Sequence, residues 1–137
     1  MDVNTINIVT LAYLGDAIYE VYIREGLIKK GIAKVEELTK TATTYVSARG
    51  QATILEDLLN KNFFTEEELD IIKRGRNYKR SSHPKHTDII TYKYSTGFEA
   101  LIGYLYLSQK GERLKEILNQ IEVKWCIYME KMLLKKN

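Results

Sequence analysis

A chain of 137 residues, 45% of them hydrophobic, is long enough to bury a sizeable core, and we expect one domain over residues 1–137. Its net charge of +3 is too small to indicate a partner, and its one cysteine, Cys126, excludes an intramolecular disulfide. The N-terminus has no basic region ahead of a long apolar core, and no apolar run approaches the ~18–20 residues of a membrane helix. We therefore expect a cytoplasmic protein without a membrane partner.

Hydrophobic residues recur at helical spacing along the chain, and no segment shows the clear period-2 alternation of a strand, so the predicted fold class is all-α. A first helix contains residues 11–24 and ends before Gly31. A second runs from about 35 to 59, with a possible break near 47–50. Residues 65–68 form a capping-box pattern that begins a third helix, which we expect to end with Gly75 as its C-terminal cap.

The segment 76–86, RNYKRSSHPKH, contains the only proline and is predicted to be an exposed basic loop. Thr87 or Asp88 then caps a long helix through about residue 108, and a last helix covers about 112–134. Seven of the 21 Lys and Arg residues lie in the surrounding stretch 73–93: Lys73, Arg74, Arg76, Lys79, Arg80, Lys85 and Lys93. This local positive charge favours a polyanionic partner, although a solvated basic loop explains the same pattern.

Two apolar stretches each contain a carboxylate that looks misplaced. Asp16 lies in LAYLGDAIYEVYIR (11–24), and Glu99 lies in YSTGFEALIGYLYL (94–107). A helix that is apolar nearly all round is typical of a buried helix, and a buried carboxylate needs a partner, a shifted pKa or a metal. Small residues such as Gly15 and Gly103 leave room for a ligand near each acid. The spacing alone does not show that the two helices meet, so ordinary buried hydrogen bonds or ion pairs remain an alternative.

Mg²⁺ binds through one or two carboxylates while keeping several waters and taking phosphate oxygens, so the pair suggests phosphoryl-transfer chemistry. Glu20, four residues after Asp16, is a third candidate, which would contribute an oxygen to the outer shell of the metal. The alternative for Glu20 is an ion pair with a basic residue.

At these residues the sequence resembles a known family. YLGDAIYE is similar to the signature helix of the ribonuclease III family, and FEALIGYLYL resembles that family's second motif; both occur in the family's order with a comparable helical spacer. KRGRN and the stretch that contains PKHTD and then YKYST (92–96) resemble the Mini-III subgroup of bacteria. We expect a single catalytic domain without a double-stranded-RNA-binding domain.

The resemblance implies a helical, ribonuclease III-type homodimer with one active site per protomer. Asp16 and Glu99 match the family's catalytic metal-binding acids, for Mg²⁺ with Mn²⁺ as a substitute. Ala12 and Thr96 stand where the larger enzymes have two further acids, which puts a fully occupied multi-metal site in doubt. Apolar residues of the signature helix would pack at the dimer axis.

The implied function is hydrolysis of phosphodiester bonds in double-stranded RNA, in the maturation of the large-subunit ribosomal RNA precursor. A ribosomal protein or pre-ribosomal particle is a further expected partner. The candidate RNA-binding residues are Arg74, Arg76, Asn77, Lys79, Arg80 and Lys85, with Lys40, Arg49 and Gln51 as secondary candidates. The alternatives are a non-catalytic RNA- or ribosome-associated helical module and a dimeric scaffold for protein partners.

Overall fold

The computed structural model describes residues 1–79, 85 and 87–121, and this part of the chain is all-α, as predicted. A short 3-10 helix, Val3–Thr5, precedes five α-helices. These are α1 (Ile8–Lys29), α2 (Val35–Val46), α3 (Ala48–Asn60), α4 (Glu66–Asn77) and α5 (Ile89–Leu107). Residues 111–121 are also helical; the rest of the helix predicted over 112–134 lies outside the described residues, so the single domain over 1–137 stays a prediction.

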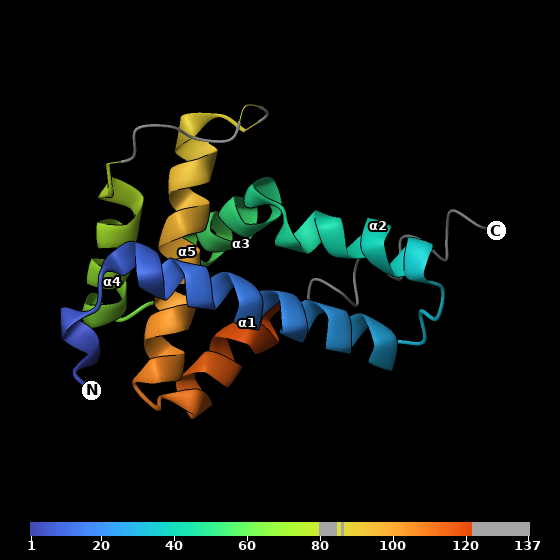
Figure 1. Cartoon of the computed structure of the whole chain (residues 1–137), viewed down its shortest axis with the longest axis horizontal. Coiled ribbons are helices and arrows are strands. Elements are labelled where there is room, and N and C mark those ends of the chain that lie inside the picture. Colours follow the sequence, from blue (N-terminus) through green and yellow to red (C-terminus); the bar gives the residue numbers. More distant parts are fainter. Residues whose placement is uncertain (80–84, 86, 122–137) are drawn as a thin grey trace.

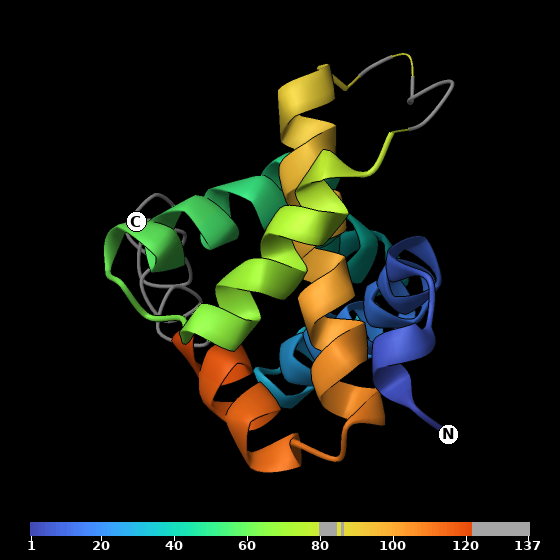
Figure 2. The same ribbon diagram turned by 90° about the vertical axis from the view of Figure 1, so that its left-hand side faces the viewer.

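Helix α5 is the axis around which α1, α3 and α4 pack, whereas α2 packs on α1 and α3. It runs vertically in Figure 1, with α1 crossing it and α3 and α4 on its other sides, and Figure 2 shows α4 alongside it. Residues 111–121 fold back beneath the lower end of α5 (Figure 2). Within residues 95–105 every residue except Glu99 is buried, so α5 is surrounded by protein along most of its length. Glu99 therefore marks an opening in this otherwise enclosed helix.

Helix α1 is buried on one face only, which corrects the expectation of a helix enclosed on all sides. Leu11, Tyr19 and Ile23 are fully buried, whereas Tyr13 is 83% exposed and Val21 63% exposed. The opposite face of α1 thus carries exposed apolar side chains that nothing in the described part of the chain covers. None of the described helices combines the length and apolarity that crossing a bilayer requires.

Most predicted helix ends are confirmed, because they depend on contacts between near neighbours. The Glu68 N–H donates to Thr65 Oγ1 (3.2 Å) and the Thr65 N–H donates to Glu68 Oε1 (2.9 Å), which completes the capping box. Asp88 caps α5 by accepting from the Thr91 N–H at 2.9 Å. The helix predicted over 35–59 is interrupted at Ser47. The Ser47 hydroxyl accepts a hydrogen bond from the Gly50 N–H and so caps the start of α3.

Three helices end in the same left-handed turn, with a positive φ at Gly31 (99°), Asn62 (53°) and Gln109 (58°). After each of these residues the next N–H donates back five residues, as in Lys110 N to Leu105 O at 2.9 Å, which is the Schellman arrangement. Only the first of the three has the glycine that made it visible in the sequence.

The prediction that Gly75 caps α4 is wrong. Helix α4 continues through Asn77, so Arg76 and Asn77 are helical and do not belong to the predicted loop. Gly75 is instead buried where α4 crosses α5, because a Cβ atom there would lie 2.9 Å from the Gly97 Cα atom. This glycine serves a close helix crossing, which local sequence does not distinguish from a cap.

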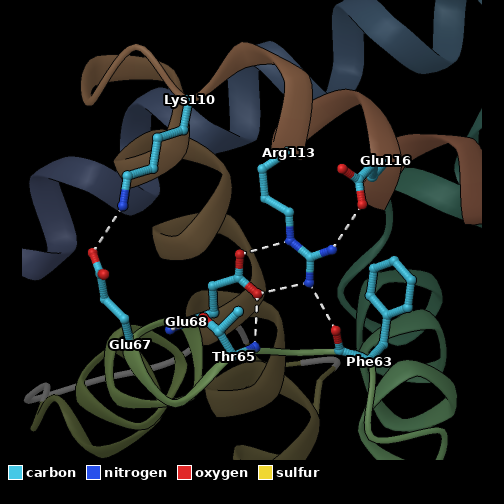
Figure 3. Close-up of polar contacts among 7 residues, drawn as sticks. All are labelled: Phe63, Thr65, Glu67, Glu68, Lys110, Arg113 and Glu116. Atoms are coloured by element: carbon cyan, nitrogen blue, oxygen red, sulfur yellow. Dashed lines mark hydrogen bonds and ion pairs between the residues drawn. The ribbon is translucent and has the colours of Figure 1, made fainter.

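A buried ion pair fastens residues 111–121 to the start of α4 (Figure 3). Arg113 binds Glu68 through two contacts of 2.8 Å, Nε to Oε2 and Nη2 to Oε1, and Glu68 is only 5% exposed. The same guanidinium donates to the Phe63 carbonyl at 2.7 Å and lies over the Phe63 ring. Burial alone would raise the pKa of Glu68, but the hydrogen bonds from Arg113 and Thr65 outweigh it and hold that pKa below its ordinary value.

Candidate active site

The site is built on a crossing of α1 and α5 in which the two backbones touch. A Cβ atom added at Gly15 would lie 1.8 Å from the Glu99 carbonyl oxygen, and one added at Gly103 would lie 2.0 Å from the Leu11 carbonyl oxygen. Distances this short leave no space for any side chain at either position. The two glycines let α1 and α5 approach more closely than ordinary ridge-into-groove packing allows.

The crossing answers the question that periodicity left open, since it shows that the helices of Asp16 and Glu99 meet. Gly15 lies directly on the backbone of Glu99, and Asp16 follows Gly15 in the chain. Asp16 is exposed and Glu99 is half-buried, so both residues reach the solvent. The expectation that Asp16 is a buried carboxylate is therefore corrected in the single chain, because it lies on the uncovered side of α1.

Gln51 is the residue at this site that the sequence analysis assigned to the wrong role. It is 2% exposed, which leaves no surface for the RNA contact predicted for it. Its Nε2 donates to the Val46 carbonyl (3.1 Å) and to Glu99 Oε2 (3.5 Å). The signal was present in the sequence, because Gln51 shares the helix face of the buried residues Ile54, Leu55 and Leu58. A polar side chain on a core face needs specific partners.

The two positions at which the resemblance led us to look for further acids hold residues that supply no carboxylate. Ala12 is buried, and Thr96 is buried with its hydroxyl donating to the Tyr92 carbonyl at 3.0 Å. In the described part of the chain no group of three or more His, Cys, Asp and Glu side chains gathers into a metal-binding cluster. The candidate site therefore rests on two carboxylates, one from α1 and one from α5.

Glu20 forms an ion pair with Arg24, Nη2 to Oε1 at 2.8 Å, one helical turn further along α1. This is the alternative that the sequence left open for Glu20. Its assignment as a third metal ligand stays a prediction.

The described part of the basic segment continues from the C-terminal turn of α4. Arg74, Asn77, Lys79 and Lys85 are exposed, whereas Arg76 is half-buried with its guanidinium 5.9 Å from the centre of the Tyr94 ring. Arg80 lies outside the described residues, as do His83 and His86. Basic groups at a helix C-terminus also interact favourably with the helix dipole.

Two further exposed cations flank the corner between α2 and α3. Lys40 and Arg49 line a hollow of about 530 Å³ over this corner. Arg49 also lines a second hollow of about 540 Å³, which extends to Asp88 and Thr91 at the start of α5. The two hollows share Ser47 and Arg49, so a continuous hollowed surface runs from α2 to the N-terminal end of the helix that holds Glu99.

Comparison with known proteins identifies the class to which this fold and site belong. The ribonuclease III domain matches residues 9–110, and the chain belongs to the ribonuclease III family. This confirms the resemblance that the two motifs indicated. It also confirms the enzyme class, an endoribonuclease that acts on double-stranded RNA.

Individual relatives of high sequence identity indicate the subgroup within this family. A protein of Enterococcus faecalis named Mini-ribonuclease 3 is 47% identical over 126 residues, 92% of each chain. Its namesake in Brevibacillus brevis is 51% identical over 119 residues, 87% of each chain. A crystal structure of a protein from Fusobacterium nucleatum matches with a TM-score of 0.79 and 33% identity, over 90% of this chain and 97% of that one. The Mini-III subgroup expected from the sequence is thus confirmed.

Proposed function

We propose that Asp16 and Glu99 hold the divalent metal with which this endoribonuclease hydrolyses its phosphodiester bonds. The observation that supports the proposal is the contact of Gly15 with the Glu99 backbone, which brings together the two helices that carry these acids. The proposed ion is Mg²⁺, with Mn²⁺ as a substitute, because both prefer carboxylate, phosphate and water oxygens.

The residues present fit such an ion. Mg²⁺ in phosphate chemistry usually takes one or two protein carboxylates and completes its shell with water and substrate oxygens. An exposed Asp16 and a half-buried Glu99 leave room for those oxygens. When bound, the ion supplies stabilisation of phosphate charge and lowers the pKa of water. Asp16 and Glu99 bind and orient it, while the glycine crossing fixes the separation of the helices that carry them. Ala12 and Thr96 add no ligand, so a site with few protein ligands is favoured.

The RNA path proposed here runs along exposed basic residues from two parts of the fold. Arg74, Asn77, Lys79 and Lys85 are exposed at and beyond the C-terminal end of α4, and Lys40 and Arg49 are exposed near the corner between α2 and α3. A-form duplexes are recognised mainly through phosphates and 2′-hydroxyls, which such side chains can contact. Arg80 belongs to the same proposal from sequence alone.

A homodimer completes the proposed enzyme. The uncovered face of α1 carries Tyr13, Ala17 and Val21, and a second copy seated on it would bury these apolar side chains. Two copies would bring two sites to one duplex, one for each strand. The proposed substrate is the precursor of large-subunit ribosomal RNA in the cytoplasm, with a ribosomal protein or pre-ribosomal particle as a further partner.

The proposal is tested by separating binding from cleavage. A duplex RNA incubated with the protein and Mg²⁺ should be cut, and cutting should stop in EDTA and return when Mg²⁺ or Mn²⁺ is restored, because the phosphate charge is stabilised by the ion. Gel shifts in EDTA report binding in the same samples. A duplex that is bound but never cut with any divalent metal would instead support a non-catalytic RNA-binding module.

The basic residues make a separate prediction about salt. Replacing Arg74 and Lys79 by Gln should weaken duplex binding and lower the slope of log K against log salt by about one for each phosphate that the protein no longer neutralises. Arg76→Gln is measured by itself, because Arg76 also packs on Tyr94. The matched control is Lys34→Gln with Lys115→Gln, which removes two exposed charges elsewhere. If the two double variants have equal slopes of log K against log salt, the RNA-binding surface does not include the end of α4.

A further inference from the structure

Gln51 has more polar contacts than a core residue of α3 requires. The Gln51 amide contacts two hydrogen-bond acceptors, the Val46 carbonyl and the Glu99 carboxylate. A carbonyl oxygen can only accept hydrogen bonds, and so can a carboxylate when it is ionised. The amide must therefore turn its NH₂ group toward them, and its Oε1 must point elsewhere. Among the described residues, Gln51 Oε1 is the one buried side-chain N or O atom without a hydrogen-bond partner.

A purely structural role accounts for part of this arrangement. The last carbonyls of a helix lack partners within it, and the Gln51 amide satisfies that of Val46 at the end of α2. The Tyr19 hydroxyl does the same for the neighbouring Tyr45 carbonyl at 3.0 Å. A cap of this kind needs one N–H donor. It leaves unexplained both the second N–H, aimed at Glu99, and a buried acceptor that raises the free energy of the folded chain while it is unpaired.

We propose that Gln51 is a positioning residue of the metal site, whose amide N–H orients the Glu99 carboxylate and whose Oε1 accepts a hydrogen bond from the hydrated cation. This inference rests on the metal site proposed above. Groups that hold a metal ligand in place and contact the ion's hydration shell commonly change metal affinity by about 10–100-fold when they are removed. Gln51 reaches Glu99 from α3, so the site would combine α1, α3 and α5.

Direct binding of Mn²⁺, followed by the paramagnetic resonance signal of the free ion, gives a readout that needs no RNA and no catalysis. Gln51→Met keeps the length of the side chain and removes its polar atoms. We expect it to raise the Kd for Mn²⁺ about tenfold, and to raise the Mg²⁺ concentration for half-maximal cleavage by a similar factor. Gln51→Asn keeps the amide but withdraws it from Glu99 by one methylene, so it should also raise the Kd for Mn²⁺.

Tyr19→Phe is the matched control, since it removes a cap bond at the same end of α2 and leaves the Gln51 contact to Glu99 intact. It should lower the melting temperature of the metal-free protein while the Kd for Mn²⁺ stays at the wild-type value. An unchanged Kd in Gln51→Met would overturn the positioning role. If Gln51→Met does not fold, Gln51→Asn decides, and a wild-type Kd in that variant overturns the role.

Asp16→Asn, measured in parallel, separates this inference from the site on which it rests. If Asp16→Asn loses Mn²⁺ while Gln51→Met binds it normally, the metal site stands and only the role of Gln51 fails. If Asp16→Asn binds Mn²⁺ as the wild type does, the site proposed for Asp16 and Glu99 is itself wrong, and the inference about Gln51 falls with it.

Discussion

Asp16→Asn and Glu99→Gln are each expected to reduce cleavage of duplex RNA by about 10³-fold or more, while the variants still fold and bind the duplex. Each change keeps the size of the side chain and removes the negative charge that holds the metal. The metal supplies several kcal/mol of charge stabilisation, and about 1.4 kcal/mol corresponds to a factor of ten in rate. Initial cleavage rates in saturating Mg²⁺, with circular dichroism as a check on folding, measure the effect.

Two other glutamates on α1 provide the controls. Glu25→Gln removes an exposed charge that pairs with Lys29 and should leave the rate unchanged. Glu20→Gln distinguishes the two roles of that residue, because an ion pair with Arg24 alone predicts no change and a contribution to the metal site predicts a clear loss. Wild-type rates in either Asp16→Asn or Glu99→Gln would contradict the assignment of that acid.

The second large effect is on stability, and it concerns the ion pair of Figure 3. Arg113→Met should lower the free energy of unfolding by about 2–3 kcal/mol at pH 7, since it leaves the buried Glu68 carboxylate without its cation. Lys110→Met is the matched control, because it removes a cation that pairs with Glu67 at the surface, 3.0 Å from Nζ to Oε1. An exposed pair contributes about 0–1 kcal/mol, so the control should unfold close to the wild type. Urea unfolding measures both variants.

The same ion pair predicts a dependence on pH. Hydrogen bonds from Arg113 and Thr65 hold the pKa of Glu68 below its ordinary value of 4.5, despite its burial. A group whose pKa is lowered by folding stabilises the protein above its ordinary pKa, and that contribution is lost as the pH falls through the folded pKa. The wild type should therefore lose more stability than Arg113→Met between pH 6 and about 3. Parallel losses in the two proteins would show that Glu68 is not responsible.

Local signals in the sequence predicted the helices well, because their causes lie within a few residues. The Thr65 capping box, the break at Ser47 and the stop at Gly31 each depend on neighbours in the chain. The prediction that Gly75 caps α4 was wrong for an equally physical reason. A glycine at the end of a charged helix fits a cap and a close crossing alike, and the second depends on Gly97, which lies in another helix.

The candidate site was predictable from sequence only in part. Periodicity showed that Asp16 and Glu99 are unusual, but the resemblance to a family was needed to pair them. Burial was overestimated for Asp16 because an apolar helix face can remain uncovered in one copy of the chain. Gln51 was grouped with Lys40 and Arg49 as a candidate RNA contact, although helical spacing places it on the buried face of Ile54, Leu55 and Leu58. Its contact with Glu99 joins distant segments, as does that of Glu68 with Arg113, and neither contact leaves a local pattern.

The crossing at Gly15 has a consequence for the stage of folding at which the proposed site can form. The proposed acid pair cannot form in the extended chain, because α1 is synthesised well before α5 and the helices that carry the two acids meet only when they pack in the core. A domain of this kind folds as a unit once its last core element is available. A nascent copy on the ribosome could therefore not use the proposed site until α5 has packed against α1 at Gly15.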